Sequence, residues 1–338
     1  MGLGLLGRGV GDIRFLAEEG AELIVTDLKT KEELHDSLEQ LKDLSHITYI
    51  LGEHRLEDFR NRDFILKAAG VALDSHYIAE ARKQGIPIEM STALFAALTP
   101  ATVIGITGTR GKSTVTHLLH AVLHKAFGET RTIFLGGNVR GVSTLAFLKD
   151  AKKDDIAVLE LDSWQLQGFG ERKISPHIAI FTTFFSDHLN YYKNDIDAYL
   201  ADKAYIFTNQ HEGNNDVLII GEQAEQILTK HFNRYFHRFT TIAKATDVPA
   251  DWKLVMEGEH NRYNASLVFH AARALNIPDE TIKNIFAEFK GVPGRLELIK
   301  EKDGIKIYND TTATTPDATM VALKALGKNT VLIMGGAD

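Results

Sequence analysis

The sequence contains no cysteine, and this absence excludes disulfide bonds and zinc sites built on thiolates. It also fits a reducing compartment. No run of about 18 or more apolar residues occurs, so no segment is predicted to span a membrane. The first residues, MGLGLLGRGVGDIRFL, have neither the basic start nor the small-residue cleavage site of a secretory signal. We therefore expect a cytoplasmic protein with no membrane partner.

A surplus of basic residues is also lacking, because 38 Lys and Arg stand against 45 Asp and Glu and the formal net charge is −7. Proteins that bind nucleic acid normally carry a basic face, so we expect no nucleic-acid partner. The composition, with 44% hydrophobic and 25% charged residues, is ordinary for a globular protein. A chain of 338 residues is long enough for two or three domains, and we expect a monomer.

Short β-branched runs alternate with helical patterns along the chain, which is typical of parallel sheets with crossover helices. The sequence therefore predicts an α/β protein. The expected strands span residues 21–27, 47–53, 101–109, 131–137, 155–162, 178–185, 216–222 and 329–336. The expected helices span residues 112–127, 196–207, 260–275 and 279–289.

Two breaker-rich stretches, at 91–100 and 291–295, suggest domain boundaries. We expect a Rossmann-like domain over 1–95, a central P-loop ATPase domain with a mostly parallel sheet over 96–292, and the start of a third α/β domain over 293–338. A hairpin is predicted over 295–310, turning at Asp303 and Gly304. Since the last segment is shorter than an ordinary domain, we expect the third domain to be incomplete.

The glycines of GLGLLG match the dinucleotide-binding pattern G-x-G-x-x-G, and an acidic residue, Asp27, follows Gly7 by 20 positions. That pattern should follow a strand, yet only Met1 precedes it. We expect the first strand of this sheet to be missing or to lie upstream. An NAD-dependent dehydrogenase is one interpretation of the pattern, and a plain strand-to-helix turn is another.

A second glycine-rich turn, GTRGKST at 108–114, lies between a predicted buried strand and a predicted helix. Glycines allow several N–H groups to converge on phosphate oxygens at a helix N-terminus. Lys112 would reach the β- and γ-phosphates and Ser113 would bind Mg²⁺. A strict P-loop has glycine where this chain has Ile106, so the loop is a variant. The ATP-binding residues predicted here are Gly108, Thr109, Arg110, Gly111, Lys112, Ser113 and Thr114.

From this loop onward the sequence resembles the Mur ligases of peptidoglycan synthesis. The motifs that carry the resemblance occur in the family's order: GTRGKST (108–114), GGN (136–138), LELDSWQL (159–166), DHLNYY (187–192), ADKAYIF (201–207), GEHNRYNA (258–265), PGRLE (293–297) and NDTTAT (309–314). They are most similar to the member that joins D-glutamate to UDP-N-acetylmuramoyl-L-alanine. The resemblance implies an ATP-dependent amide-bond ligase that works through an acyl phosphate.

The resemblance also implies two Mg²⁺ ions held by Ser113, Glu160, His188 and Lys203. Glu160 closes a predicted strand, where a carboxylate naturally faces a nucleotide crevice, although a solvated strand-end charge is the commoner case. The family's lysine at the Lys203 position is carbamylated by CO₂, which requires a neutral amine. Composition alone would place Lys203 on a solvated helix face and His188 on the surface.

Further family positions complete the expected site. Those near ATP are Asn261, Asn264, Arg295 and Asp310; those near the substrates are Gly4, Leu5, Leu6, Asp27, Lys29, Asn138 and Thr314. A family lysine is replaced here by Thr312, and we expect Arg110 to supply the missing charge. The family's S-P-G loop reads Ala68-Ala69-Gly70.

Three alternatives stay open at this point. A muramate:L-alanine ligase usually has the loop T-H-G-K-T-T, and a folylpolyglutamate synthase typically has G-K-G-S, whereas this chain has Gly111-Lys112-Ser113-Thr114. A catalytically incomplete nucleotide-binding fragment is the third alternative, because the expected third domain is short.

Overall fold

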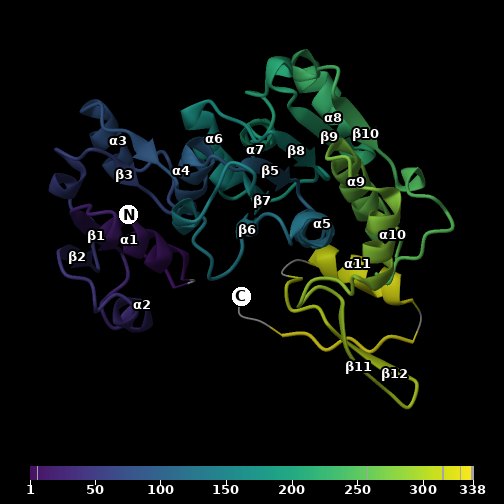
Figure 1. Cartoon of the computed structure of the whole chain (residues 1–338). Coiled ribbons are helices and arrows are strands. Elements are labelled where there is room, and N and C mark those ends of the chain that lie inside the picture. The colour runs from purple at the N-terminus through teal and green to yellow at the C-terminus, as the bar shows by residue number, and fades with distance from the viewer. Residues whose placement is uncertain (6, 257, 314–315, 328, 336–338) are drawn as a thin grey trace. The chain divides into compact units, whose positions relative to one another are not determined.

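The computed structural model describes residues 1–5, 7–256, 258–313, 316–327 and 329–335 (Figure 1). The chain divides into two compact units. The first contains Met1–Lys112 and Phe127–Ile242, and the second contains Ser113–Ala126 and Ala243–Asp338. No helix in the described part of the chain is both long and apolar enough to cross a bilayer.

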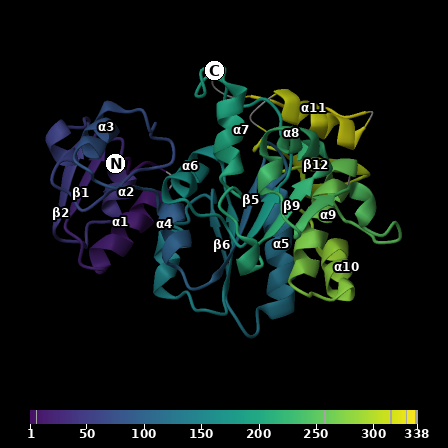
Figure 2. The ribbon, with the colours of Figure 1, turned by 90° about the horizontal axis from the view of Figure 1, so that it is seen from above.

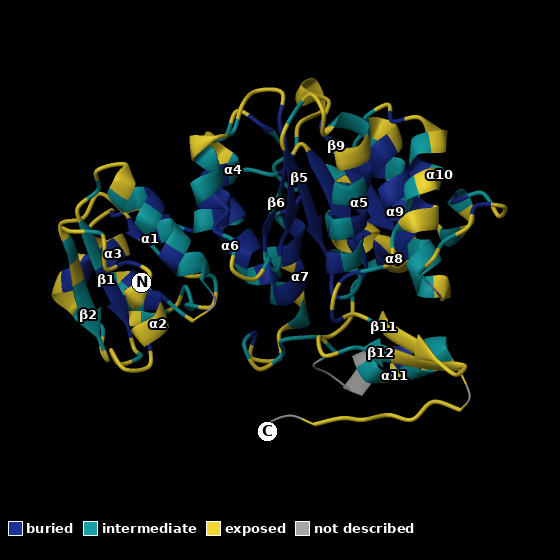
Figure 3. Ribbon diagram, turned by 60° about the horizontal axis from the view of Figure 1, so that its bottom comes forward, coloured by how far each residue is buried: buried dark blue, intermediate teal, exposed yellow. Residues whose placement is uncertain are grey.

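A six-stranded sheet forms the centre of the first unit, in the order β10-β9-β8-β5-β7-β6. The strands are β5 (Thr102–Thr107), β6 (Ile133–Gly137), β7 (Ile156–Glu160), β8 (Ile178–Phe181), β9 (Val217–Gly221) and β10 (Thr240–Ala243). The pairs β6–β7, β7–β5, β5–β8 and β8–β9 are parallel. Figure 3 shows β5, β6 and β9 largely buried, as their β-branched, apolar sequences require. The predicted α/β fold is confirmed.

The helices of this part of the unit are α4 (Ser91–Leu98), α6 (Ser163–Arg172), α7 (Ile196–Ala204) and α8 (Glu222–Phe232). Asp162 begins α6 with a capping box, because its side chain accepts from the N–H of Gln165 while the Gln165 side chain accepts from the N–H of Asp162. Helix α7 ends at Ala204, three residues before the predicted end at 207. Short 3-10 turns connect several elements: η1 (Leu56–Phe59), η2 (Leu145–Lys149), η3 (Glu212–Asn214), η4 (Asn233–Tyr235) and η5 (Ala245–Asp247).

The N-terminal part of this unit contains two parallel strand pairs, which are β1 (Leu23–Asp27) with β2 (Ile47–Leu51), and β3 (Ile65–Leu66) with β4 (Ile88–Glu89). Figure 2 shows β1 and β2 side by side. The helices here are α1 (Arg8–Glu18), α2 (His35–Glu39) and α3 (His76–Lys83). Gly2 donates to the carbonyl of Thr26 at 2.8 Å and Ala68 donates to that of Met1 at 2.9 Å, so residues 1–2 lie between β1 and β3.

The second unit contains α5 (Lys112–Phe127), apart from its two end residues, together with the C-terminal part of the chain. Helices α9 (Glu259–Ala274) and α10 (Asp279–Glu288) lie side by side (Figure 1), and α11 (Pro316–Leu326) follows later in the sequence. The predicted hairpin is present as β11 (Glu297–Lys302) and β12 (Ile305–Asn309). Its turn residues, Asp303 and Gly304, have φ of 52° and 75°.

The strand predicted at 329–336 is wrong for the residues that the structure describes there. Residues 331–335 are irregular, and Val331 and Ile333 are 88% and 93% exposed. A strand is stabilised by pairing with another strand and by burial of one face. This apolar run has neither, so its β propensity alone does not form a strand.

Candidate nucleotide-binding and catalytic site

The glycine-rich loop 108–111 joins the C-terminal end of β5 to the first residue of α5. Gly108 has a φ of 139°, and a Cβ there would lie 2.0 Å from Oγ1 of Thr182, so only glycine fits. The residues after β8 hold the loop. Thr109 N donates to the carbonyl of Thr183 at 2.7 Å, and Arg110 N donates to Oγ1 of Thr183 at 2.9 Å. The loop is therefore fixed at the C-terminal edge of the sheet, where parallel sheets bind ligands.

Two lysines converge on this loop. The ammonium groups of Lys112 and Lys203 donate to the carbonyl of Gly108 at 3.1 and 2.8 Å. Lys203 is only 2% exposed, and its Nζ lies 4.8 Å from the ring centroid of Tyr199. Burial, and then the nearby charge of Lys112, hold the pKa of Lys203 well below its ordinary value. The neutral amine, which is the form that reacts with CO₂, is therefore easier to reach at Lys203 than at an exposed lysine.

Glu160 is the last residue of β7 and is buried. The neighbouring strand β6 brings Asn138 to it, because Asn138 N donates to the Glu160 carbonyl at 2.7 Å and Asn138 Nδ2 lies 3.4 Å from Oε1. This approach requires Gly137, where a Cβ would lie 2.1 Å from the Glu160 carbonyl oxygen. Glu160 is also paired in register with Ile106 of β5, which places it beside the glycine-rich loop.

His188 lies in the loop after β8, with a φ of 52°. Its ring lies 4.9 Å from Trp164 and 6.0 Å from Tyr199, measured between ring centroids. Tyr199 therefore links His188 to Lys203, and its hydroxyl lies 3.4 Å from Oγ1 of Thr109. The sequence analysis did not identify Tyr199. Its spacing of four residues from Lys203 on one helix was the available signal, since such residues share a face.

The His188 loop is anchored by a buried polar network that the sequence analysis also missed. The hydroxyl of Tyr192 donates to Oδ2 of Asp202 at 2.9 Å, and Nε2 of Gln167 donates to the same oxygen at 2.8 Å. Burial raises the pKa of Asp202. These contacts connect α6, α7 and the loop, so the position of His188 depends on all three.

The donors near the loop fit magnesium only in part. Among the described residues, no group of three or more His, Asp or Glu side chains is placed to hold a metal. Mg²⁺ prefers oxygen ligands. Glu160 supplies one carboxylate beside the loop, and the carboxylates of Asp162 and Asp187 act electrostatically on Lys203. The carboxylate donors fit Mg²⁺ in part, and the carbamate on Lys203 stays a prediction.

The remaining predicted ATP residues lie in the second unit. Ser113 and Thr114 follow Lys112 in the first turn of α5. Asn264 Nδ2 lies 3.5 Å from Oδ1 of Asn261, which confirms that they share a face of α9. Arg295 is exposed, and Asp310 accepts from the N–H of Leu296 at 3.0 Å. Thr314 lies outside the described residues.

Near the N-terminus, Asp27 supports the glycine turn. Its two carboxylate oxygens accept from the N–H groups of Gly4 and Lys29, each at 2.9 Å. Leu5 is exposed, and Leu6 lies outside the described residues. The contacts of these residues with a uridine diphosphate group stay a prediction, since both Asp27 oxygens already bind the backbone.

A glycine-rich loop between a buried parallel strand and a helix, with a lysine at its end, defines a nucleotide-binding α/β protein of the P-loop class. The Mur ligase middle-domain model matches residues 106–278, and the model for the N-terminal domain of MurD-like Mur ligases matches residues 1–89. The chain belongs to the Mur ligase family. Members of this family are ATP-dependent ligases that form a C–N bond, and the predicted family is confirmed.

Relatives support this assignment over the whole chain. A UDP-N-acetylmuramoylalanine–D-glutamate ligase from Borreliella burgdorferi is 36% identical over 100% of this chain and 76% of its own length. A protein of the same name from Roseiflexus is 35% identical, with 100% and 77% covered. A solved UDP-N-acetylmuramate–alanine ligase from Thermotoga maritima is 22% identical, with a TM-score of 0.58 over 96% of this chain and 76% of that one. The similarity to the Thermotoga maritima structure supports the fold alone.

Proposed function

We propose that this chain joins D-glutamate to UDP-N-acetylmuramoyl-L-alanine at the expense of ATP, as the names of its relatives state for them. The observation that carries the proposal is the convergence of Lys112 and Lys203 on the Gly108 carbonyl. Lys112 on this loop serves phosphoryl transfer, which demands positioning and neutralisation of charge, and the buried amine of Lys203 beside it is the group that would carry the carbamate. An NAD-dependent dehydrogenase that used the GLGLLG turn would not need the two lysines at the second glycine-rich loop.

The reaction needs activation because a carboxylate is a poor electrophile. An oxygen of the alanyl carboxylate attacks the γ-phosphorus of ATP, the bond to the β-phosphate oxygen breaks, and ADP leaves. The product is an acyl phosphate. The amine of D-glutamate then attacks the acyl carbon and loses a proton, and the tetrahedral intermediate expels inorganic phosphate. The new bond is an amide.

The proposed roles follow from the site. Lys112 binds the transferred phosphate, and Asn138 orients it or the substrate carboxylate beside Glu160. Ser113, Glu160, His188 and carbamylated Lys203 would hold two Mg²⁺ ions, which neutralise phosphate charge when bound. The support for the carbamate is the burial of the Lys203 amine and its pKa, which lies well below the ordinary value. We place the reaction in the cytoplasm and assign it to a monomer.

Phosphate release tests the proposal. The chain is mixed with ATP, Mg²⁺ and UDP-N-acetylmuramoyl-L-alanine, with D-glutamate, L-glutamate, glycine or no amino acid. We expect release only with D-glutamate. Release that follows another amino acid would assign the chain to another ligase of the superfamily. Nucleotide binding without any release would contradict catalysis by this chain and favour the incomplete fragment.

A further inference from the structure

One side of helix α1 lies against the segment 138–149, which follows β6. A Cβ added at Gly7 would lie 3.3 Å from the Cα of Gly141, and one added at Gly11 would lie 2.5 Å from the Cβ of Ser143. The two glycines are four residues apart, so they share one side of the helix. Because glycine has no side chain, α1 packs closely on this segment.

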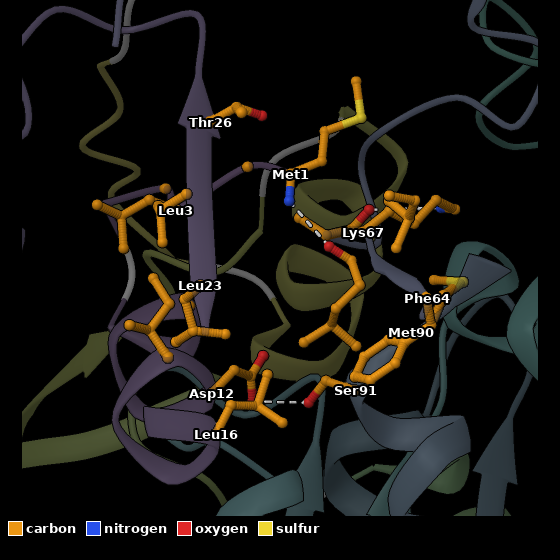
Figure 4. A pocket seen from close by; sticks show the side chains of 18 of the residues that line it. Met1, Leu3, Asp12, Leu16, Leu23, Thr26, Phe64, Lys67, Met90 and Ser91 are labelled. Atoms are coloured by element: carbon orange, nitrogen blue, oxygen red, sulfur yellow. Dashed lines mark hydrogen bonds between the residues drawn. The ribbon is translucent and has the colours of Figure 1, made fainter. Parts of the chain in front are cut away.

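The carboxylate of Asp12, in α1, joins three elements. Its Oδ1 atom accepts from the hydroxyl of Ser143 at 2.6 Å and from the hydroxyl of Ser91, the first residue of α4, at 2.8 Å. Figure 4, which looks into a cavity beside α1, shows the bond to Ser91. Desolvation raises the pKa of Asp12, and the two serine hydroxyls offset part of that rise. A desolvated carboxylate depends on such donors, so these bonds hold α1, α4 and the segment 138–149 together.

Apolar packing and an ion pair extend this contact along α1. Phe15 is buried in the same hydrophobic cluster as Leu145, and Glu18 forms an ion pair with Lys149. Ile13 belongs instead to the cluster that contains residues of β1 and β2. Helix α1 is therefore shared by two hydrophobic clusters, one of which includes the start of the 3-10 turn η2.

The Asp12–Ser143 bond lies next to the closure of the loop that contains Asn138. Thr144 follows Ser143, and its Oγ1 accepts from the N–H of Gly137 at 2.8 Å. This bond joins the two ends of the loop, because Gly137 directly precedes Asn138. The carboxylate in α1 therefore binds the residue next to the point where the loop is fixed to the end of β6.

We propose that Asp12 is a positioning residue of the ligase reaction, which keeps Asn138 beside Glu160 by binding Ser143. The inference rests on the proposed function, in which Asn138 orients the transferred phosphate or the substrate carboxylate. Helix α1 begins at the glycine turn, so the helix predicted to meet the diphosphate of the sugar substrate also sets the position of the Asn138 loop. Asp12 acts through Ser143 and not on a reacting atom.

Two serine variants give a matched test, because both serines donate to the same Asp12 oxygen and only Ser143 belongs to the Asn138 loop. We expect Ser143→Ala to lower kcat for D-glutamate-dependent phosphate release about tenfold, whereas Ser91→Ala should leave it within about twofold of the wild type. The KM for ATP should change in neither variant, because residues after β8 hold the nucleotide-binding loop. An equal kcat in the two variants would overturn the proposal.

Variants of Asp12 separate positioning from a general loss of stability. Asp12→Asn keeps an acceptor oxygen and should retain most of the kcat, whereas Asp12→Ala should lose about tenfold. In an Asn138→Ala background, Asp12→Ala should change kcat by less than about twofold, because the side chain that Asp12 positions is already absent. The same loss in both backgrounds would show that Asp12 does not act through Asn138.

Amide hydrogen exchange, measured without substrates, tests the positioning separately from the proposed function. Residues 138–144 should exchange about tenfold faster in Asp12→Ala and Ser143→Ala than in the wild type or Ser91→Ala. This pattern in a chain that releases no phosphate would support the positioning of the loop by Asp12 and contradict the ligase function. Equal exchange in all four proteins would overturn the positioning, even in an active ligase.

Discussion

Lys67 gives the sharpest prediction about stability. Its side chain is 2% exposed, and its ammonium group donates to the carbonyls of Val71 at 2.8 Å and Ala68 at 3.4 Å. Desolvation lowers its pKa from 10.5 to about 8, and the distant carboxylates of Asp162 and Glu171 raise it only partly again. The folded protein therefore releases this proton more readily than the unfolded chain does.

The sign and size of the effect follow from proton linkage. Between about pH 8 and 10.5 the unfolded chain binds more protons at Lys67, so the free energy of unfolding rises with pH in that window. From pH 7 to about pH 9.5 the Lys67 contribution rises by about 2 kcal/mol. The Lys67→Met variant has no such titration. Its loss of two hydrogen bonds changes the free energy of unfolding by an amount that does not vary with pH.

The assay is urea unfolding of the wild type and of Lys67→Met at several pH values in this range. The stability of the wild type relative to Lys67→Met should rise by about 2 kcal/mol from pH 7 to about pH 9.5. Lys83→Met is the matched control, because the Lys83 side chain is 75% exposed, and its difference from the wild type should stay constant. A constant difference for Lys67→Met would refute the reasoning.

Three further predictions concern the candidate catalytic site. Gly137→Ala should lower the free energy of unfolding by about 2–4 kcal/mol in urea melts, because its Cβ meets the Glu160 backbone at a positive φ. Gly213→Ala is the control, because a Cβ added at Gly213 has no neighbouring atom within 4 Å. Equal losses of stability in the two variants would reject the clash at Gly137. With ¹³C-labelled bicarbonate, the wild type should show a carbamate NMR signal that Lys203→Arg lacks, and activity should fall about 100-fold or more in that variant. An active wild type that shows no signal and ignores bicarbonate would exclude the carbamate. Arg110→Asn should reduce phosphate release about tenfold or more if Arg110 replaces the family lysine, whereas a change within about twofold would reject that role.

The central sheet was predictable because its strands are buried on both faces. Runs such as those of β5 and β7 are almost wholly apolar, and the structure confirms them. The predicted strand over 178–185 extends past the real end of β8 at Phe181, since its later residues bind the glycine-rich loop instead. Helix α6 was not predicted, although Asp162 and Gln165 have the spacing of a capping box.

Parts of the candidate site could not be predicted because they depend on tertiary contacts. Asp202 and Tyr192 lie on different elements, and only the fold brings them together. The spacing predicted a ligand contact for Asp27 but did not indicate its second role, since both carboxylate oxygens accept from backbone N–H groups of its own turn. The burial of Lys203 was expected only from the family resemblance, and the structure supplies its physical cause.

The central claim is ligation through an acyl phosphate, and isotope transfer tests it most directly. UDP-N-acetylmuramoyl-L-alanine labelled with ¹⁸O in both carboxylate oxygens is incubated with the chain, ATP, Mg²⁺ and D-glutamate. Mass spectrometry then follows the label. The account predicts one ¹⁸O in the released phosphate and the other in the amide of the D-glutamyl product. Unlabelled phosphate, or release without an amide product, would contradict it.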